Sequence, residues 1–195
     1  IAYNEANRLK ELTKDIVDVA KMESGSVSLN KEIIDLNELT KEVYTEMEEL
    51  VKEKNLDFSV NVSPDLPYEL TGDEVRIKQI LINLLNNAVK YTNEGSIDMI
   101  VHCDKTDNDD KINMIFDISD TGIGIKKDSI PYLFTAFKRV DEEKNRYIEG
   151  TGLGLSIVKQ FVDLMGGKIS VNSVYTKGST FIIEIPQQIA SDNAI

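Results

Sequence analysis

The sequence predicts an α+β fold, a two-layer α/β sandwich in which helices cover one face of a mixed sheet and a single amphipathic helix precedes it. Three observations support this prediction. Residues 56–62 and several later segments alternate apolar and polar side chains, as half-buried strands do. Other segments repeat apolar residues every three or four positions, as helices do. The two kinds of segment are interleaved along the chain, which places helices and strands in one domain.

The first segment, residues 2–22, has the pattern of an amphipathic helix. Its apolar residues recur at spacings of three, four and three, at Leu9, Leu12, Ile16 and Val19. Charged residues lie between them, so the apolar residues form one seam of a coiled coil or bundle. Glu23, Ser24 and Gly25 then end the helix. Two interpretations stay open: a helix whose partner lies outside this chain, or a helix packed on the domain that follows.

The remaining elements follow from the same two patterns. We expect strands near residues 33–36, 56–62, 97–103, 111–118, 168–174 and 180–185, and helices near 37–54, 73–91, 129–137 and 153–164. Pro64 and Pro67 should break the chain after the second strand. Residues 138–150 are polar and lack apolar periodicity, so we expect a loop there.

Composition and charge exclude several classes of protein. The chain has 195 residues, of which 41 % are hydrophobic, as in a soluble globular domain. No run approaches the about 20 apolar residues needed to cross a bilayer. A net charge of −12 opposes contact with nucleic acid or acidic lipid, because both attract basic patches. The single cysteine, Cys103, favours a reducing, cytoplasmic location. The first residue, Ile1, suggests a fragment whose parent protein could be anchored in a membrane.

The first candidate cluster lies on the helix predicted over residues 73–91. Asn83, Asn87, Lys90 and Tyr91 share one face of that helix by the three-and-four spacing. A neutral amide oxygen can ligate Mg²⁺, and a lysine one turn along can contact a phosphate. Taken alone, the same pattern is also typical of a solvated helix face.

The second candidate cluster, residues 117–125, follows the strand predicted over residues 111–118. Gly122 and Gly124 let the backbone approach a flat ligand, and an ionised Asp120 can accept hydrogen bonds from an exocyclic amine. A simple strand-ending turn explains one glycine but not all three residues together. The acidic residues lack the spacing of a calcium-binding loop.

The third candidate cluster, residues 150–156, precedes the helix predicted over residues 153–164. Its sequence is Gly-Thr-Gly-Leu-Gly-Leu-Ser. Glycines at a helix N-terminus free backbone N–H groups to bind phosphate. The cluster lacks the Lys-Ser or Lys-Thr pair of a P-loop, and its glycine spacing differs from the dinucleotide-binding fingerprint.

Together, in this order, the three clusters resemble the N, G1 and G2 boxes of sensor histidine kinases. These kinases belong to a wider ATPase group that includes type II topoisomerases, mismatch-repair ATPases and a heat-shock chaperone. Residues 134–137 resemble the F box of the family, and residues 178–181 its last box. The resemblance covers residues 27–187 and implies the Bergerat (GHKL) ATP-binding fold. Residues 1–24 look like the second helix of the dimerisation and phosphotransfer hairpin of the family.

The resemblance implies a role for each matching residue in the binding of ATP and Mg²⁺. Asn87 would ligate Mg²⁺ with the support of Asn83, Lys90 would reach a phosphate, Tyr91 would lie against the nucleotide, and Asp120 would bind the adenine amine. The full set that it assigns to ATP binding is Asn83, Asn87, Lys90, Tyr91, Asp120, Gly122, Gly124, Ile125, Thr151, Gly152, Leu153, Gly154, Leu155 and Thr180.

Catalysis would involve both the first cluster and the loop over residues 138–150. That loop would be the ATP lid, in which Arg139 or Arg146 approaches the terminal phosphate, and the catalytic set is completed by Asn83 and Lys90. Thr180 would join the adenine site through water. Gly152 and Gly154 would present backbone N–H groups to the phosphates.

The chain departs from the family pattern in its histidine. Family members carry the phosphoacceptor histidine on the first hairpin helix, followed by an acidic residue. The one histidine here, His102, lies in a predicted strand and precedes Cys103. We therefore expect a surface histidine and no phosphoacceptor in this chain.

Two functions other than histidine kinase activity are compatible with this fold. An ATP-hydrolysing switch of the same fold would carry a glutamate where this chain has Asn83, and an amide cannot activate water as a carboxylate can. A non-catalytic, nucleotide-dependent interaction module is the second alternative, and the intact boxes argue against it.

The predicted organisation is a partial hairpin helix (1–24), a catalytic ATP-binding domain (25–187) and a tail or linker (188–195). The expected activity is transfer of the γ-phosphoryl group of ATP to a histidine on the missing hairpin. The expected partners are that hairpin and the receiver domain of a response regulator. We expect a homodimer in the full-length protein, a weak dimer or monomer here, and no contact with nucleic acid or membrane.

Overall fold

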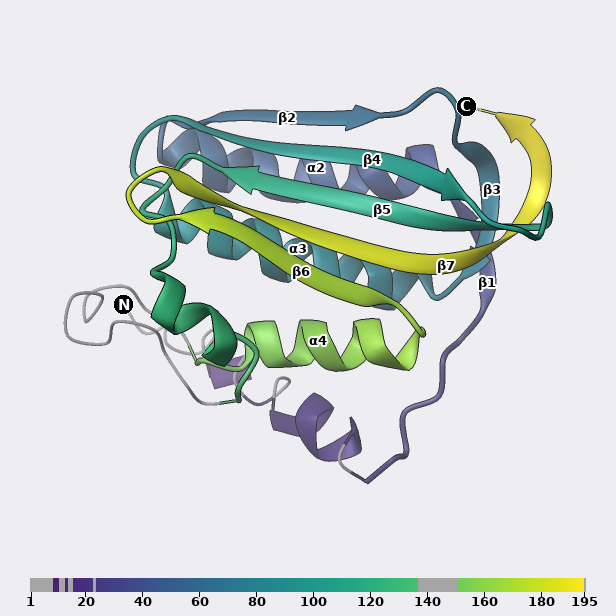
Figure 1. Ribbon diagram of the computed structural model, residues 1–195, viewed down its shortest axis with the longest axis horizontal. Coiled ribbons are helices and arrows are strands. Elements are labelled where there is room, and N and C mark those ends of the chain that lie inside the picture. The colour runs from purple at the N-terminus through teal and green to yellow at the C-terminus, as the bar shows by residue number, and fades with distance from the viewer. Residues whose placement is uncertain (1–8, 11–12, 14–15, 23, 137–150, 195) are drawn as a thin grey trace.

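The computed structural model describes residues 9–10, 13, 16–22, 24–136 and 151–194. A seven-stranded mixed sheet runs in the order β1-β3-β7-β5-β4-β2, and β6 also pairs with β7. The strands are β1 (Glu32–Asp35), β2 (Asp57–Val62), β3 (Pro67–Gly72), β4 (Ser96–Lys105), β5 (Lys111–Asp120), β6 (Lys168–Val174) and β7 (Gly178–Ala194). Neighbours are antiparallel except β2 and β4, which are parallel. The predicted two-layer sandwich is confirmed, with α2 and α3 behind the sheet and α4 next to them below β6 (Figure 1).

The helices are α2 (Leu36–Glu53), α3 (Glu74–Tyr91) and α4 (Gly154–Leu164), close to their predicted ranges. Asp35 caps α2 by accepting hydrogen bonds from two backbone N–H groups, and Asp73 caps α3 by accepting one from Arg76. Each helix buries one apolar stripe against the sheet, such as Ile77, Leu81, Leu84 and Leu85 on α3. The polar residues of the first cluster, on α3, lie outside this stripe and remain partly exposed.

Three predicted elements need correction. The break expected at Pro67 is instead the first residue of strand β3, because a strand can begin at a proline. The helix expected near 129–137 is a short 3₁₀ helix at Lys127–Tyr132, and it contains Pro131. The last strand was expected to end at Ile185, with a tail from residue 188. It continues to Ala194, because its last residues pair with β3.

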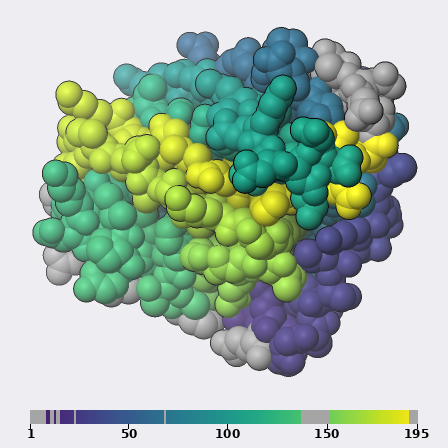
Figure 2. All heavy atoms as spheres, turned by 45° about the vertical axis from the view of Figure 1, so that its right-hand side comes forward, coloured from purple at the N-terminus to yellow at the C-terminus, as the bar shows by residue number. Residues whose placement is uncertain are grey.

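The N-terminal segment is helical over residues 16–22 and lies at the lower edge of the molecule (Figures 1 and 2, purple). Val19 is only 8 % exposed and joins the hydrophobic core, whereas Leu9 is 64 % exposed and Ile16 49 %. Leu12 lies outside the described residues. Part of the predicted seam therefore packs on the domain, and part faces outward.

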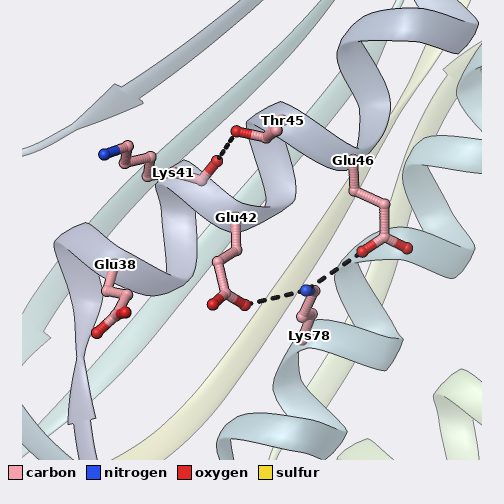
Figure 3. A pocket seen from close by; sticks show the side chains of 6 residues that line it. All are labelled: Glu38, Lys41, Glu42, Thr45, Glu46 and Lys78. Carbon is pink, nitrogen blue, oxygen red and sulfur yellow. Dashed lines mark hydrogen bonds and ion pairs between the residues drawn. The ribbon is translucent and has the colours of Figure 1, made fainter.

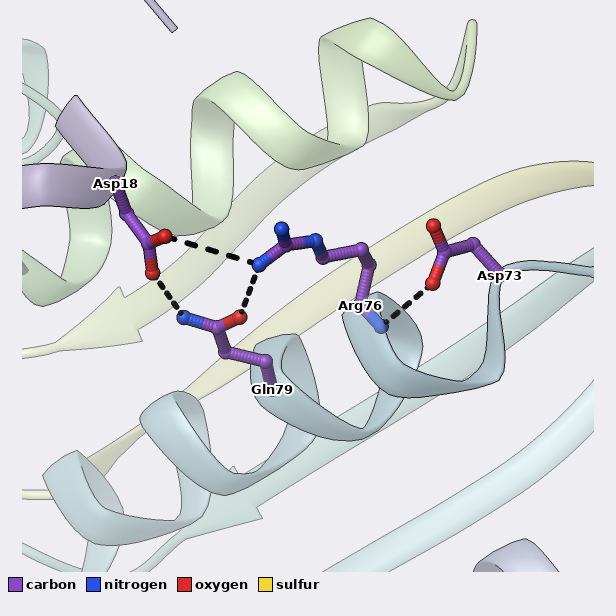
Figure 4. A network of polar contacts seen from close by, with 4 residues as sticks. All are labelled: Asp18, Asp73, Arg76 and Gln79. Carbon is purple, nitrogen blue, oxygen red and sulfur yellow. Dashed lines mark hydrogen bonds and ion pairs between the residues drawn. The ribbon is translucent and has the colours of Figure 1, made fainter. Parts of the chain in front are cut away.

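One polar network joins this helix to α3 (Figure 4). The Asp18 carboxylate accepts a hydrogen bond from Gln79 Nε2 at 3.0 Å and lies 3.8 Å from a guanidinium nitrogen of Arg76. The same guanidinium donates to Gln79 Oε1 at 2.9 Å and stacks over the ring of Phe161 on α4. The N-terminal helix is thus tied to the first half of α3 and, through Arg76, to α4.

Candidate functional site

The C-terminal half of α3 carries the first predicted cluster. Asn83, Asn87, Lys90 and Tyr91 are all partly exposed, while Leu84, Leu85 and Ala88 between them are buried in the core. The Lys90 ammonium lies 5.2 Å from the centre of the Tyr91 ring. The predicted polar face of this helix is therefore present, with two amide side chains and one cation along it.

Asp120 stands at the end of β5, at the start of the second cluster. Its carboxylate accepts hydrogen bonds from the backbone N–H groups of Gly122, at 2.9 Å, and Ser179. Burial raises the pKa of Asp120, and the two hydrogen bonds oppose that shift without cancelling it. A partly desolvated carboxylate is a strong acceptor for an amine ligand.

Gly122, two residues after Asp120, allows the loop to touch the end of α3. A Cβ atom on Gly122 would lie 2.3 Å from the carbonyl oxygen of Tyr91 and 2.8 Å from Thr92 Oγ1. The next residue, Ile123, donates its backbone N–H to that same Tyr91 oxygen at 3.1 Å. The first and second clusters are therefore in direct backbone contact, which only glycine permits here.

The strand β7 closes the other side of the Asp120 loop. Gly178 has a φ of +111°, and a Cβ atom there would lie 2.0 Å from the Asp120 carbonyl oxygen. Ser119 and Thr180 face each other across β5 and β7, with their hydroxyl oxygens 2.9 Å apart. Sequence reasoning missed Ser119, although its register opposite Thr180 would follow once the two strands were paired.

The third cluster begins α4 and lies next to α3. Gly152 adopts a φ of +73°, and the Leu153 N–H donates to Thr151 Oγ1 at 3.2 Å. A Cβ atom on Gly154 would meet Asn83 Oδ1 at 3.9 Å, so the start of α4 adjoins the first cluster. Among the described residues no side chain caps this helix. The first N–H groups of a helix are a natural site for an anion.

The other predicted residues have mixed outcomes. Ile125 and Leu155 are partly buried and pack against the core, and the Ile125 N–H donates to Ser173 Oγ at 2.8 Å. Ser173 was not predicted, because a serine in an edge strand carries no sequence signal. The predicted lid over residues 138–150, with Arg139 and Arg146, lies outside the described residues, and so does Phe137, the last residue of the predicted F box.

His102 lies on β4, as predicted, and is partly exposed. Its Nε2 is 3.0 Å from Asp117 Oδ2 on the neighbouring strand. This pair sits within the sheet and away from the loop that follows Asp120, so it does not belong to the candidate site.

A hollow lies between α2 and α3, apart from the three clusters (Figure 3). Its lining consists of Glu38, Lys41, Glu42, Thr45, Glu46 and Lys78. The Lys78 ammonium is already paired, at 3.0 Å from Glu42 and 3.2 Å from Glu46. Carboxylates of this density repel a polyphosphate, so this hollow is not the nucleotide site. In the described part of the chain, no group of three His, Cys, Asp or Glu side chains is arranged to hold a metal ion.

Residues 72–189 match the family model described as histidine kinase-, DNA gyrase B- and HSP90-like ATPase. The chain belongs to this family. The match includes all three clusters, from the polar face of α3 to the Thr180 strand. Among the described residues, no helix is long and apolar enough to cross a membrane.

Curated relatives are histidine kinases of much greater length. Hybrid signal transduction histidine kinase B of Dictyostelium discoideum is 38 % identical over 92 % of this chain, which is 9 % of that protein. Signal transduction histidine-protein kinase BarA of Escherichia coli is 37 % identical over 92 % of this chain, which is 20 % of that protein. The chain therefore corresponds to a small part of each relative.

Solved structures agree with this assignment. Full-length ShkA in complex with AMPPNP superposes with a TM-score of 0.82 at 28 % identity, over 96 % of this chain and 38 % of ShkA. The catalytic domain of histidine kinase ThkA superposes with a TM-score of 0.62 at 33 % identity, over 80 % of this chain and 97 % of that domain. The chain thus has the fold of a histidine kinase catalytic domain.

Proposed function

We propose that this chain is the ATP-binding catalytic domain of a sensor histidine kinase, and that it transfers the γ-phosphoryl group of ATP to a histidine on a phosphotransfer hairpin. The observation that carries the proposal is the convergence of the three clusters. The Asp120 loop contacts the end of α3 through Tyr91, and the start of α4 lies beside Asn83. An amine acceptor and a helix N-terminus thus lie on either side of one polar helix face, as adenine and phosphates require.

In this proposal each group of residues binds one part of ATP. Asp120 accepts from the adenine amine, and Gly122 and Gly124 admit the ring. The N–H groups at the start of α4, from Gly152 and Gly154, and the Lys90 ammonium hold the phosphates. Thr180, whose hydroxyl lies 2.9 Å from that of Ser119, would contact adenine through water. Tyr91 lies against the nucleotide.

The amide side chains of α3 fit a magnesium ion that is bound mainly by phosphate oxygens and water. Asn87 is the proposed ligand and Asn83 its support, since one or two protein oxygens suffice for Mg²⁺ in such sites. When bound, the ion neutralises charge on the phosphate oxygens. The protein contributes mainly positioning for in-line transfer, and Lys90 stabilises developing charge. Arg139 and Arg146, outside the described residues, remain proposed contacts of the terminal phosphate.

The residue types favour transfer over hydrolysis. An ATPase switch of this fold needs a carboxylate one turn before the metal-binding asparagine, and Asn83 occupies that position. An amide has no usable basicity near neutral pH, whereas a neutral histidine acceptor is itself a nucleophile. The proposed partners are the phosphotransfer hairpin and the receiver domain of a response regulator. We expect both partners in the cytoplasm. We also expect the longer protein to be a dimer.

Calorimetric titration with MgATP tests the binding half of the proposal. The wild-type chain should bind MgATP, and Asp120→Ala should weaken binding by roughly tenfold or more, because an unmet polar group in a closed pocket costs about 1–3 kcal/mol. Asp117→Ala, on the same strand but paired with His102, is the matched control and should bind as wild type does. Equal affinities for the three proteins would remove Asp120 from the site.

Radiolabelled ATP tests the transfer half. The chain alone should acquire no acid-labile label, and a separately supplied protein with the full hairpin should be labelled slowly, because no tether raises its local concentration. An unlabelled hairpin with normal MgATP binding would favour the non-catalytic interaction module. Rapid phosphate release without a hairpin would favour the ATPase switch.

A further inference from the structure

We propose that Lys54 is a positioning residue for the nucleotide site, and this inference rests on the proposed function. Lys54 follows the last residue of α2 and belongs to none of the predicted clusters. Its ammonium donates to the carbonyl oxygens of Val89 at 2.7 Å, Lys90 at 3.3 Å and Thr92 at 3.3 Å. All three oxygens belong to the end of α3, beside the residues proposed to bind ATP.

A helix-ending motif fixes the backbone of Lys54. The Asn55 N–H donates to Lys52 O at 3.0 Å, and the Leu56 N–H donates to Val51 O at 3.1 Å. Asn55 has a φ of +54°, so this is a Schellman ending in which asparagine takes the left-handed position. Val51 and Leu56 are both buried in the core and anchor the motif. The side chain of Lys54 therefore starts from a rigid point.

The last regular helical bond of α3 runs from the Thr92 N–H to Ala88 O, at 3.0 Å. The carbonyl groups that follow, on Val89, Lys90, Tyr91 and the C-cap Thr92, have no partner within a regular helix. Tyr91 O accepts from the Ile123 N–H at 3.1 Å, and the other three accept from the Lys54 ammonium. A cation at a helix C-terminus also interacts favourably with the helix dipole. Lys54 is thus the group that completes the end of α3.

The end of α3 is in turn the support for the Asp120 loop. Tyr91 O receives the Ile123 N–H, and Gly122 packs against the same oxygen. Thr92 is fully buried between these contacts. The following turn is tied as well, because Asp57 N donates to Gly95 O at 3.0 Å. Lys54 therefore fixes the backbone from Val89 to Thr92. That backbone in turn positions the Lys90 and Tyr91 side chains and the Asp120 loop.

Binding of ATP by three substituted chains tests the proposal. Lys54→Met keeps the apolar stem and removes the donors, so it should weaken MgATP binding about five- to tenfold, as the loss of charge-assisted hydrogen bonds predicts. Lys54→Arg should recover most of the affinity. Lys52→Met is the matched control, because Lys52 is exposed and its ammonium pairs with Glu48 in the same helix. It should bind as wild type does.

Hydrogen exchange of the free proteins supplies the second readout. Lys54→Met should speed exchange at residues 90–96 and 121–124, and Lys54→Arg should restore protection. A purely structural role would lower the melting temperature of Lys54→Met while leaving its ATP affinity unchanged well below that temperature, and this result would overturn the proposal. If the wild-type chain fails to bind MgATP, the proposed function fails instead. Unchanged exchange in both segments would then show that Lys54 does not order the loop.

Discussion

The two ends of α3 are held in different ways, and each way serves a different neighbour. The C-terminal end is held through its backbone, by Lys54 on one side and Ile123 on the other. The N-terminal half is held through side chains, by the Asp73 cap and by the contacts of Arg76 and Gln79 with Asp18. Both arrangements suit the helix dipole, with carboxylates near its start and an ammonium at its end.

The difference separates a rigid site from an adjustable attachment. At the C-terminal end the Ile123 N–H bonds directly to Tyr91 O, so this contact between the Asp120 loop and α3 does not depend on a side-chain rotamer. At the other end, long side chains connect α3 to a helix whose residues Leu9 and Ile16 remain exposed. Such a contact can change without disturbing the site, and the four predictions below test this independence, from the largest expected effect to the smallest.

Gly122→Ala should have the largest effect, because its Cβ would overlap the Tyr91 carbonyl oxygen at 2.3 Å. We expect a loss of about 2 kcal/mol or more in the free energy of unfolding, together with loss of ATP binding. Gly154→Ala is the control for the substitution itself, since the nearest atom of the described residues would lie 3.9 Å from its Cβ. Its stability, measured by urea unfolding, should equal that of wild type, and equal losses in the two variants would contradict the tight contact.

Asp73→Ala should have the next largest effect, at the other end of the helix. The carboxylate of Asp73 is buried and accepts from the N–H groups of Arg76 at 3.0 Å and Asn30 at 2.9 Å. Its loss should cost about 1–2 kcal/mol of stability, the usual range for a helix cap. Asp73→Asn keeps one acceptor oxygen and should lose less. ATP affinity measured by calorimetry should stay within about twofold of wild type for both. A large loss of affinity would show that the two ends are coupled.

Asp18→Ala should act mainly on the N-terminal helix. Removing the acceptor of Gln79 should speed hydrogen exchange over residues 16–22, because Asp18 and Val19 are the only buried side chains among the residues that the structure describes in that helix. Global stability should change by less than about 1 kcal/mol, since Arg76 keeps its contacts with Gln79 and Phe161. Asp18→Asn, which retains an acceptor, should exchange more slowly than Asp18→Ala. Exchange rates unchanged in both variants would mean that this network does not hold the helix.

The pH dependence of stability should reveal the smallest effect, from Asp120. Because burial raises the pKa of this carboxyl in the folded protein, the protonated form is favoured on folding. The stabilisation that follows is present below the unfolded pKa and is lost as pH rises through the folded pKa. The melting temperature of wild type, relative to that of Asp120→Asn, should therefore increase as pH is lowered from neutrality into the carboxyl range. A decrease of the wild-type melting temperature relative to that of Asp120→Asn would show that the pKa of Asp120 is lowered on folding, not raised.

Much of the candidate site could be predicted from the sequence, because its parts are local. The spacing of Asn83, Asn87 and Lys90 places them on one helix face regardless of what surrounds that helix. Gly122 and Gly124 reveal a close backbone approach before any neighbour is known. The helices over residues 36–53 and 74–91 have long apolar stripes and aspartate caps, so their type and limits were predicted closely.

What the sequence by itself determined was therefore the set of elements and the chemistry carried on each of them. The tertiary structure alone decided which groups meet, because those contacts join residues far apart in the chain. Lys54 at the end of a helix is typical of a solvated cation, and only the packing of α2 beside α3 places it on three carbonyl oxygens. Strand β3 likewise depends on its partners β1 and β7, since its own residues alternate weakly and begin with a proline. The periodicity that predicts a helix or strand depends on residues close together in the sequence. Strand pairing and long-range hydrogen bonds depend instead on residues that meet only when the core is packed.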